Sequence, residues 1–173
     1  MIKQVLKSGD PALRLKSKPA SKVDKKVKSL IKDLKDTLIN HRDPEGVGLA
    51  APQIGKNVRV FVMKQGKNIK AVVNPKIVKI SATKTKKSGK MLLEGCLSVP
   101  HYYGPLKRQN KVVLSYITDE GKRVTEKFEG FEAQIILHEI DHLDGVLFVD
   151  KLLEENTPLF KQNSEGEWEE VEL

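Results

Sequence analysis

The sequence predicts an α+β domain in which mixed, mainly antiparallel sheets pack around a central helix that carries a His-Glu-x-x-His motif. Residues 131–145 are apolar enough for a buried helix, and two regions rich in β-branched residues, 58–80 and 111–129, are broken by turn residues. No low-complexity linker divides the 173 residues. We therefore expect one domain over residues 1–173 that ends in an acidic tail at 154–173.

The first half of the chain predicts one amphipathic helix followed by strands. Apolar residues recur at spacings of three and four from Val23 to Leu38, and the lysines between them face water. Ser21 is the expected N-cap, and the helix should end before Pro44. Residues 58–63 and 70–74 then predict an antiparallel hairpin that 77–80 extend, whereas the lysine-rich residues 82–90 predict a mobile loop.

The second half predicts another hairpin and then the buried helix. Residues 111–118 and 122–129 alternate in polarity and are joined by Asp-Glu-Gly, a strong hairpin signal. Gly130 precedes the apolar helix, after which the apolar run 146–153 is expected to return to the sheet. The last twenty residues could form a final strand or remain loose.

Charge is distributed unevenly along the chain. Residues 154–173 hold seven Glu and one Lys, so residues 1–153 carry 30 basic against 16 acidic side chains. Such a basic body predicts a transient, salt-dependent attraction to the ribosome. A merely solvated basic surface is the alternative. The lysines have no aromatic residues interleaved for stacking on bases, so no specific nucleic-acid partner is expected.

The sequence favours a cytoplasmic protein that does not interact with membranes. It has no apolar run of eighteen residues, and its first residues lack the apolar core of a signal peptide. The single cysteine, Cys96, has no partner for an internal disulfide, which agrees with a reducing compartment.

His138, Glu139 and His142 form the most informative motif. Residues four apart share one face of a helix, so the two imidazoles can bind one ion while Glu139 projects beside it to move a proton. A surface helix that happens to carry two histidines is the alternative. The apolar flanks argue against it, because they predict burial, where unpaired polar groups are costly.

Two histidines are one ligand short of a catalytic metal site, which usually has three protein ligands and one open position. No histidine follows His142, so a downstream third histidine is excluded. Cys96 is then the best candidate, although a lone cysteine is more often a small buried hydrophobe. A thiolate and two imidazoles would suit a divalent first-row metal.

Residues 46–55 contain little side-chain bulk, since glycines and alanines alternate with few larger residues. Small residues let a ligand approach the backbone and pair with it as an added strand. A tight loop with only a structural role explains these residues equally well.

Taken together, these stretches resemble the three motifs of the peptide deformylase family, in the same order and spacing: residues 46–53, 94–98 and 138–142. The resemblance extends to about residue 153. It implies an α+β fold and a metal-dependent hydrolase that removes the N-formyl group from N-formylmethionyl nascent peptides and releases formate. It also implies one divalent ion on Cys96, His138 and His142: iron(II) in the cell, and often zinc, nickel or cobalt in purified protein.

The resemblance assigns further roles around that ion. Glu139 would act as general base and then general acid, while Gln53 and the backbone N–H of Leu97 would bind the formyl oxygen.

Substrate binding and support are also implied. Val47 and Gly48 would hold the peptide backbone, and an apolar pocket near Ile135 and His138 would take the methionine side chain. Glu94 matches the family's buried acid, with Arg108 standing where its usual arginine partner is found.

The chain departs from the family pattern at three places. Tyr103 stands where some bacterial members have a substrate-contacting arginine, and Leu137 stands where glutamine often precedes the third motif. The tail is short and acidic, whereas many members end in a long basic helix that docks on the ribosome.

A zinc peptidase and a metal-stabilised binding module without turnover are the rival interpretations. The cysteine motif argues against the first, and the presence of Glu139 and Gln53 against the second.

Overall fold

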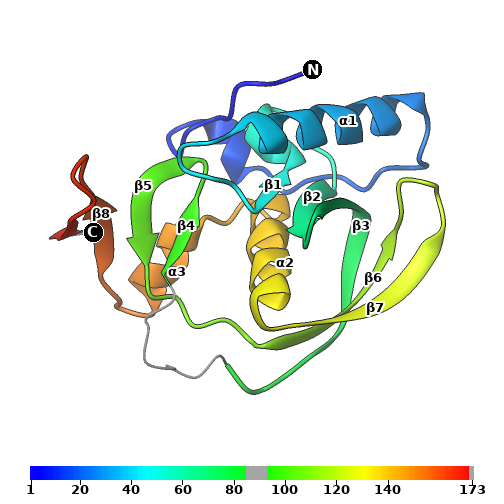
Figure 1. The fold of residues 1–173 in the computed structure, drawn as a ribbon. Coiled ribbons are helices and arrows are strands. Elements are labelled where there is room, and N and C mark those ends of the chain that lie inside the picture. Colours follow the sequence, from blue (N-terminus) through cyan, green and yellow to red (C-terminus); the bar gives the residue numbers. More distant parts are fainter. Residues whose placement is uncertain (85–92, 172–173) are drawn as a thin grey trace.

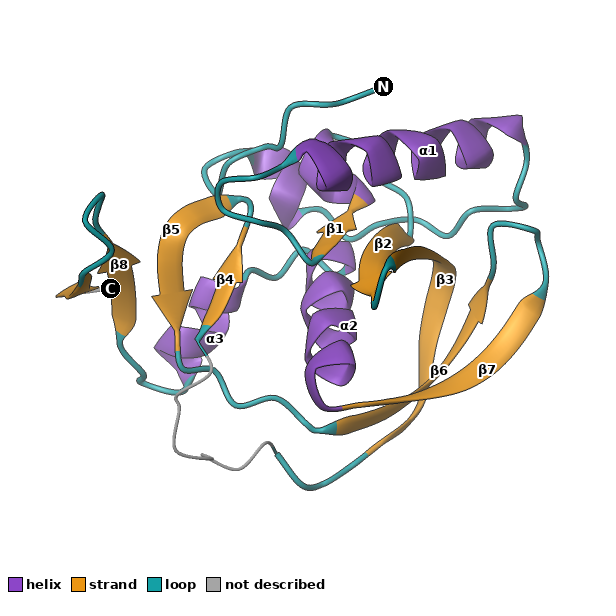
Figure 2. Cartoon of the chain, in the orientation of Figure 1, coloured by secondary structure: helices purple, strands orange, loops and turns teal. Residues whose placement is uncertain are grey.

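Two antiparallel sheets flank a central helix in the computed structural model, which describes residues 1–84 and 93–171 (Figure 1). The larger sheet has the strand order β1-β2-β3-β6-β7 and the smaller one β4-β5-β8-β9. Helix α2, Gly130–Leu143, stands between them, with the smaller sheet on one side and the larger on the other (Figure 2). This arrangement confirms the predicted α+β class.

The larger sheet contains both hairpins expected from the sequence. Val62 pairs with Ala71 in the first hairpin and Ser115 with Thr125 in the second. Residues 77–80 continue the second strand of the first hairpin, as expected. The strands of this sheet are β1 (Gly48–Ala50), β2 (Val60–Gln65), β3 (Asn68–Ile80), β6 (Lys111–Ile117) and β7 (Arg123–Glu129).

The smaller sheet is built from the cysteine motif and the tail. Of the two outcomes left open for the last twenty residues, the strand is observed, and a further strand precedes it. Its members are β4 (Glu94–Cys96), β5 (Val99–Gly104), β8 (Leu159–Gln162) and β9 (Trp168–Val171). The mobile loop predicted at residues 82–90 lies, from residue 85 onward, outside the described residues.

Two predictions about helices are wrong. Residues 146–153 do not return to the sheet, because α3 spans Phe148–Glu154. Its buried residues Phe148 and Leu152 are four positions apart, as on one face of a helix. Asp150 caps this helix by accepting a hydrogen bond from the backbone N–H of Leu147. Helix α1, Lys25–Asn40, is capped by Asp24 and not by Ser21. The remaining helical turns are η1 (Pro11–Arg14) and η2 (Ala51–Ile54).

The two faces of the larger sheet bury different helices. Successive residues of a strand point to opposite faces, so Phe61 and Met63 of β2 join the core beneath α2, whereas Val60 and Val62 join the core beneath α1. Leu34 and Leu38 fill the α1 side. Helix α2 is therefore enclosed by protein, which explains its apolar sequence. None of the helices in residues 1–84 and 93–171 combines the length and hydropathy needed to span a membrane.

Candidate active site

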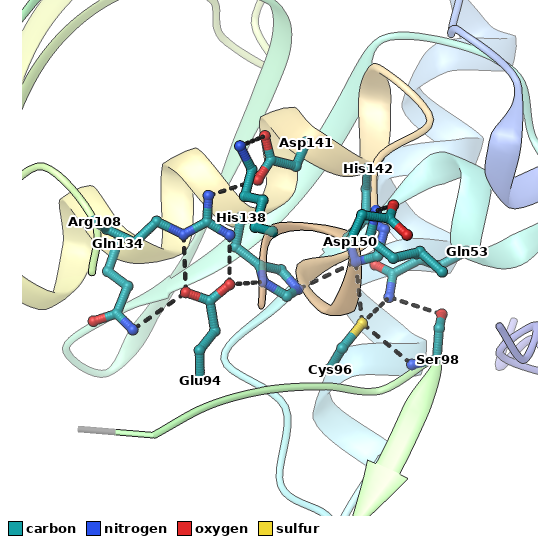
Figure 3. Close-up of polar contacts among 12 residues, drawn as sticks. Gln53, Glu94, Cys96, Ser98, Arg108, Gln134, His138, Asp141, His142 and Asp150 are labelled. Atoms are coloured by element: carbon teal, nitrogen blue, oxygen red, sulfur yellow. Dashed lines mark hydrogen bonds and ion pairs between the residues drawn. The ribbon is translucent and has the colours of Figure 1, made fainter. Parts of the chain in front are cut away.

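The three side chains that the sequence predicts as ligands of one ion converge between α2 and β4. His138 and His142 lie one turn apart on α2, and Cys96 is the last residue of β4. The Nε2 atom of His142 lies 3.1 Å from the Sγ atom of Cys96 and 3.1 Å from the Nε2 atom of His138 (Figure 3). All three donor atoms fall within 4.8 Å of one another. One sulfur and two imidazole nitrogens fit a first-row divalent ion.

The surroundings of Cys96 favour its thiolate. The thiol is buried, and the backbone N–H of Ser98 donates to its Sγ atom over 3.4 Å. Burial alone raises the pKa of the Cys96 thiol, but electrostatic attraction and hydrogen bonds from the neighbouring imidazoles of His142 and His138 outweigh burial and lower this pKa well below its usual range. The thiolate is the form that binds metals.

Glu94 fixes the orientation of His138. The Nδ1 atom of His138 donates to Glu94 Oε1 over 2.6 Å, so Nε2 keeps its lone pair on the side of the ring where the donor atoms of His142 and Cys96 lie. Burial raises the pKa of Glu94, but hydrogen bonds from Arg108 and His138 outweigh it and hold the pKa at about 2. Glu94 is therefore a carboxylate at neutral pH.

Arg108 supplies the opposite charge. Its Nε atom donates to Glu94 Oε2 over 2.9 Å, and Nη2 donates to Glu94 Oε1, so the pair is bidentate. The Nη1 atom also donates to Asp141, and the Nε2 atom of Gln134 donates to Glu94 over 3.4 Å (Figure 3). Sequence reasoning missed Asp141 and Gln134, although their offsets of +3 and −4 from His138 place them near its face of the helix.

Glu139 occupies the wall next to β1. It is only 2% exposed, and within the described residues its Oε2 atom has no hydrogen-bond partner. Burial raises the pKa of Glu139 to about 7. A Cβ atom on Gly48 would clash with Glu139 Oε1, so only glycine leaves room for this carboxylate.

Gln53 is held with its amide N–H groups toward Cys96. Its Oε1 atom accepts from the backbone N–H of Ala50 over 2.8 Å, which leaves Nε2 to donate to Ser98 Oγ over 3.2 Å. Gln53 is almost completely buried. Leu97 follows Cys96, and its carbonyl accepts from Lys7 Nζ over 3.3 Å.

A cavity of about 220 Å³ collects these groups. Strands β1 and β4 are edge strands of their sheets, and the cavity opens between them. Two predicted residues, His142 and Arg108, do not line the cavity. His142 contacts Cys96, and Arg108 pairs with Glu94. The sequence-predicted residues that line it are Val47, Gly48, Gln53, Glu94, Cys96, Leu97, Ile135, His138 and Glu139.

Comparison with known proteins agrees with this geometry. The family model described as polypeptide deformylase matches residues 2–157. The chain belongs to the peptide deformylase family. Peptide deformylases are metal-dependent hydrolases that remove the N-formyl group from the first methionine of new proteins, so the predicted family and activity are confirmed.

Individual deformylases match over most of their length. Peptide deformylase 2 of Clostridium acetobutylicum is 42% identical over 153 residues, which cover 88% of this chain and 97% of that relative. The crystal structure of the Thermotoga maritima deformylase has a TM-score of 0.79 at 37% identity, covering 87% of this chain and 97% of that one. A Synechococcus elongatus deformylase, solved in complex with actinonin, has a TM-score of 0.76 at 34% identity and covers 84% and 76%.

We expect replacement of Arg108 by alanine to lower the free energy of unfolding by about 3 to 5 kcal/mol, because it leaves the Glu94 carboxylate buried without its partner. Thermal or denaturant unfolding of the purified variant measures the loss. Lys107→Ala removes the neighbouring exposed charge and should leave stability within about 0.5 kcal/mol of the parent. Equal stability of the Arg108 variant and the parent would contradict the importance of this pair.

Proposed function

We propose that Cys96, His138 and His142 hold one divalent ion and that Glu139 moves the proton during hydrolysis of the formyl amide. One observation carries this proposal: a buried carboxylate oxygen of Glu139, which has no hydrogen-bond partner among the described residues, lines the same cavity as Cys96 and His138, two of the three clustered donors. A structural metal site has no need of such a carboxylate, whereas a hydrolytic one does. A bound ion would polarise the formyl oxygen and lower the pKa of a water molecule.

Glu139 would take a proton from the attacking water and return it to the departing amine nitrogen. Formate and a free amino terminus are then the products, and the carboxylate is regenerated. A general base works best when its pKa lies near the working pH, and burial raises the pKa of Glu139 toward that range, which opposes the lowering that a bound cation would cause. Gly48 supports this role, because it leaves the carboxylate unobstructed on the cavity side.

Gln53 and Leu97 would bind the formyl oxygen as it gains negative charge. The Gln53 amide is already oriented by Ala50, so it needs no rearrangement during the reaction. The backbone N–H of Leu97, next to Cys96, would be the second donor. Losing one donor of this kind typically costs about 2.7 to 4 kcal/mol of transition-state stabilisation.

The substrate would bind as an extended strand between the two sheets. Edge strands present unpaired backbone groups, and β1 and β4 meet at the cavity. Val47 and Gly48 would pair with the peptide backbone, and this contact would not depend on the side chains of the peptide. Ile135 and His138 would enclose the methionine side chain, which makes that residue the main determinant of specificity.

The native ion would be iron(II), with zinc, nickel or cobalt present in purified preparations. The mixed sulfur and nitrogen donors accept all four metals, so availability and not the site would decide occupancy. We also place the enzyme in the cytoplasm as a single catalytic domain, in transient contact with the ribosome through its basic body. Metal analysis after anaerobic purification, coupled to formate release, tests the identity of the ion.

Replacing Cys96 with alanine should abolish metal binding, because two imidazoles alone leave the ion without its thiolate ligand. Metal content per chain, measured after dialysis, gives the result. Ser98→Ala keeps the ligand trio and serves as the control. Full occupancy in the Cys96 variant would show that the ligands are assigned wrongly.

Glu139→Gln should retain the ion and reduce turnover at least about a hundredfold, since a positioned acid or base contributes that much. Formate release from a formyl-methionyl peptide, measured at equal metal content, tests this. Near-normal turnover would mean that another group transfers the proton.

A panel of formylated tripeptides tests the reaction itself. Replacing the first methionine with a small or acidic residue removes apolar burial worth about 1.5 to 3 kcal/mol, so kcat/KM should fall roughly tenfold or more. Internal cleavage of unformylated peptides would instead favour a peptidase. Metal binding without any turnover would favour a binding module.

A further inference from the structure

Residues 6–8 fasten two segments of the candidate site from outside the cavity. The backbone N–H of Leu6 donates to the carbonyl of Gln53 over 2.8 Å, and the backbone N–H of Ser8 donates to the carbonyl of Ser98 over 2.9 Å. None of these three consecutive residues is among the described residues that line the cavity. Their contacts therefore act on the backbone that carries the site, and not on a ligand inside it.

The side chain of Lys7 makes a third contact, to the backbone that follows Cys96. Its Nζ atom donates to the carbonyl oxygen of Leu97 over 3.3 Å. That carbonyl belongs to the peptide group whose N–H is the N–H of Ser98. The Ser98 N–H in turn donates to Cys96 Sγ over 3.4 Å (Figure 3). One peptide group thus connects the ammonium of Lys7 to the sulfur of Cys96.

A cation on the carbonyl oxygen of an amide makes that amide a stronger donor. Hydrogen bonds in a chain polarise one another, because electron density drawn toward the carbonyl oxygen leaves the N–H more positive. The Ser98 N–H then interacts more strongly with a thiolate at Cys96. The contact also restricts rotation of the Leu97 backbone, whose own N–H is the proposed donor to the formyl oxygen.

We propose that Lys7 is a positioning residue, whose charge strengthens the contact of the Ser98 N–H with the Cys96 thiolate. The same contact holds the backbone N–H of Leu97 in position for the formyl oxygen. The proposal rests on the function proposed above, in which Cys96 binds the ion and Leu97 donates to the formyl oxygen. Lys7 is exposed, so water and dissolved salt screen part of its charge. Its effect on turnover is therefore smaller than that of a donor that touches the substrate.

Steady-state release of formate from a formyl-methionyl peptide tests this role in three variants at equal metal content. Lys7→Met removes the charge and should lower kcat about threefold to tenfold, the size expected for one net hydrogen bond. KM should stay unchanged, because Lys7 does not line the cavity. Lys7→Gln should behave like Lys7→Met, since it keeps N–H donors without the charge. Lys7→Arg keeps the charge and should retain most of the parent's kcat.

Lys16→Met provides a matched control, because Lys16 is exposed in the same amino-terminal part of the chain and the variant loses the same charge. It should keep the parent's kcat. All four variants should unfold at nearly the temperature of the parent, since both side chains are exposed. A loss of kcat that appears equally in Lys16→Met, or one that Lys7→Arg does not reduce, would overturn the proposal.

The polarised contact can be measured apart from turnover, by nuclear magnetic resonance of the isotopically labelled, zinc-loaded protein. The chemical shift of the Ser98 amide proton reports the strength of its hydrogen bond. This proton should move upfield in Lys7→Met and Lys7→Gln and stay near the parent's position in Lys7→Arg. An unchanged shift in Lys7→Met would refute the polarisation.

The kinetic outcomes separate this role from the function on which it rests. If the parent releases no formate from any formylated peptide, the proposed function fails. If the parent is active and Lys7→Met has the same kcat, only the role of Lys7 is refuted.

Discussion

The site depends on one buried charge pair. Arg108 joins Glu94 of β4 to Asp141 of α2, and Glu94 in turn orients His138. The pair therefore links the smaller sheet to the central helix at the position where their side chains must converge. A hydrophobic pair could also join these elements, but it would not fix which imidazole nitrogen faces the cysteine. This requirement explains why the fold keeps several charges where desolvation is expensive.

Around that link, the candidate site draws on two kinds of element, a buried helix and the edges of two sheets. Helix α2 is enclosed on nearly every side and supplies His138, Glu139 and His142, whereas the backbone of β1 and β4 remains open at the sheet edges. In the proposed function, chemistry would therefore rest on a largely buried helix, and recognition on strands that lack one neighbour. A substrate backbone would complete both sheets at once, which couples binding to correct placement of the formyl group.

Helical spacing and local turn chemistry made much of this predictable from the sequence. The offset of four between His138 and His142 fixes their common face, and both hairpins follow from alternation and turn residues. The run 146–153 was ambiguous, because eight residues of which six are apolar suit a buried strand as well as a helix. The capping contact of Asp150 decides for the helix. The contact between Asp141 and Arg108 joins residues 33 positions apart and required the fold to be known.

The acidity of the tail has a consequence for how copies of the protein meet. Strand β9 is the outermost strand of the smaller sheet, so one side of its backbone has no neighbouring strand within the described residues. Such an edge invites a strand from another molecule, and charged side chains are a common safeguard. Glu169 and Glu170 give the edge a negative charge, so two tails repel each other. The tail hairpin can therefore expose Trp168 to solvent without becoming a site of aggregation.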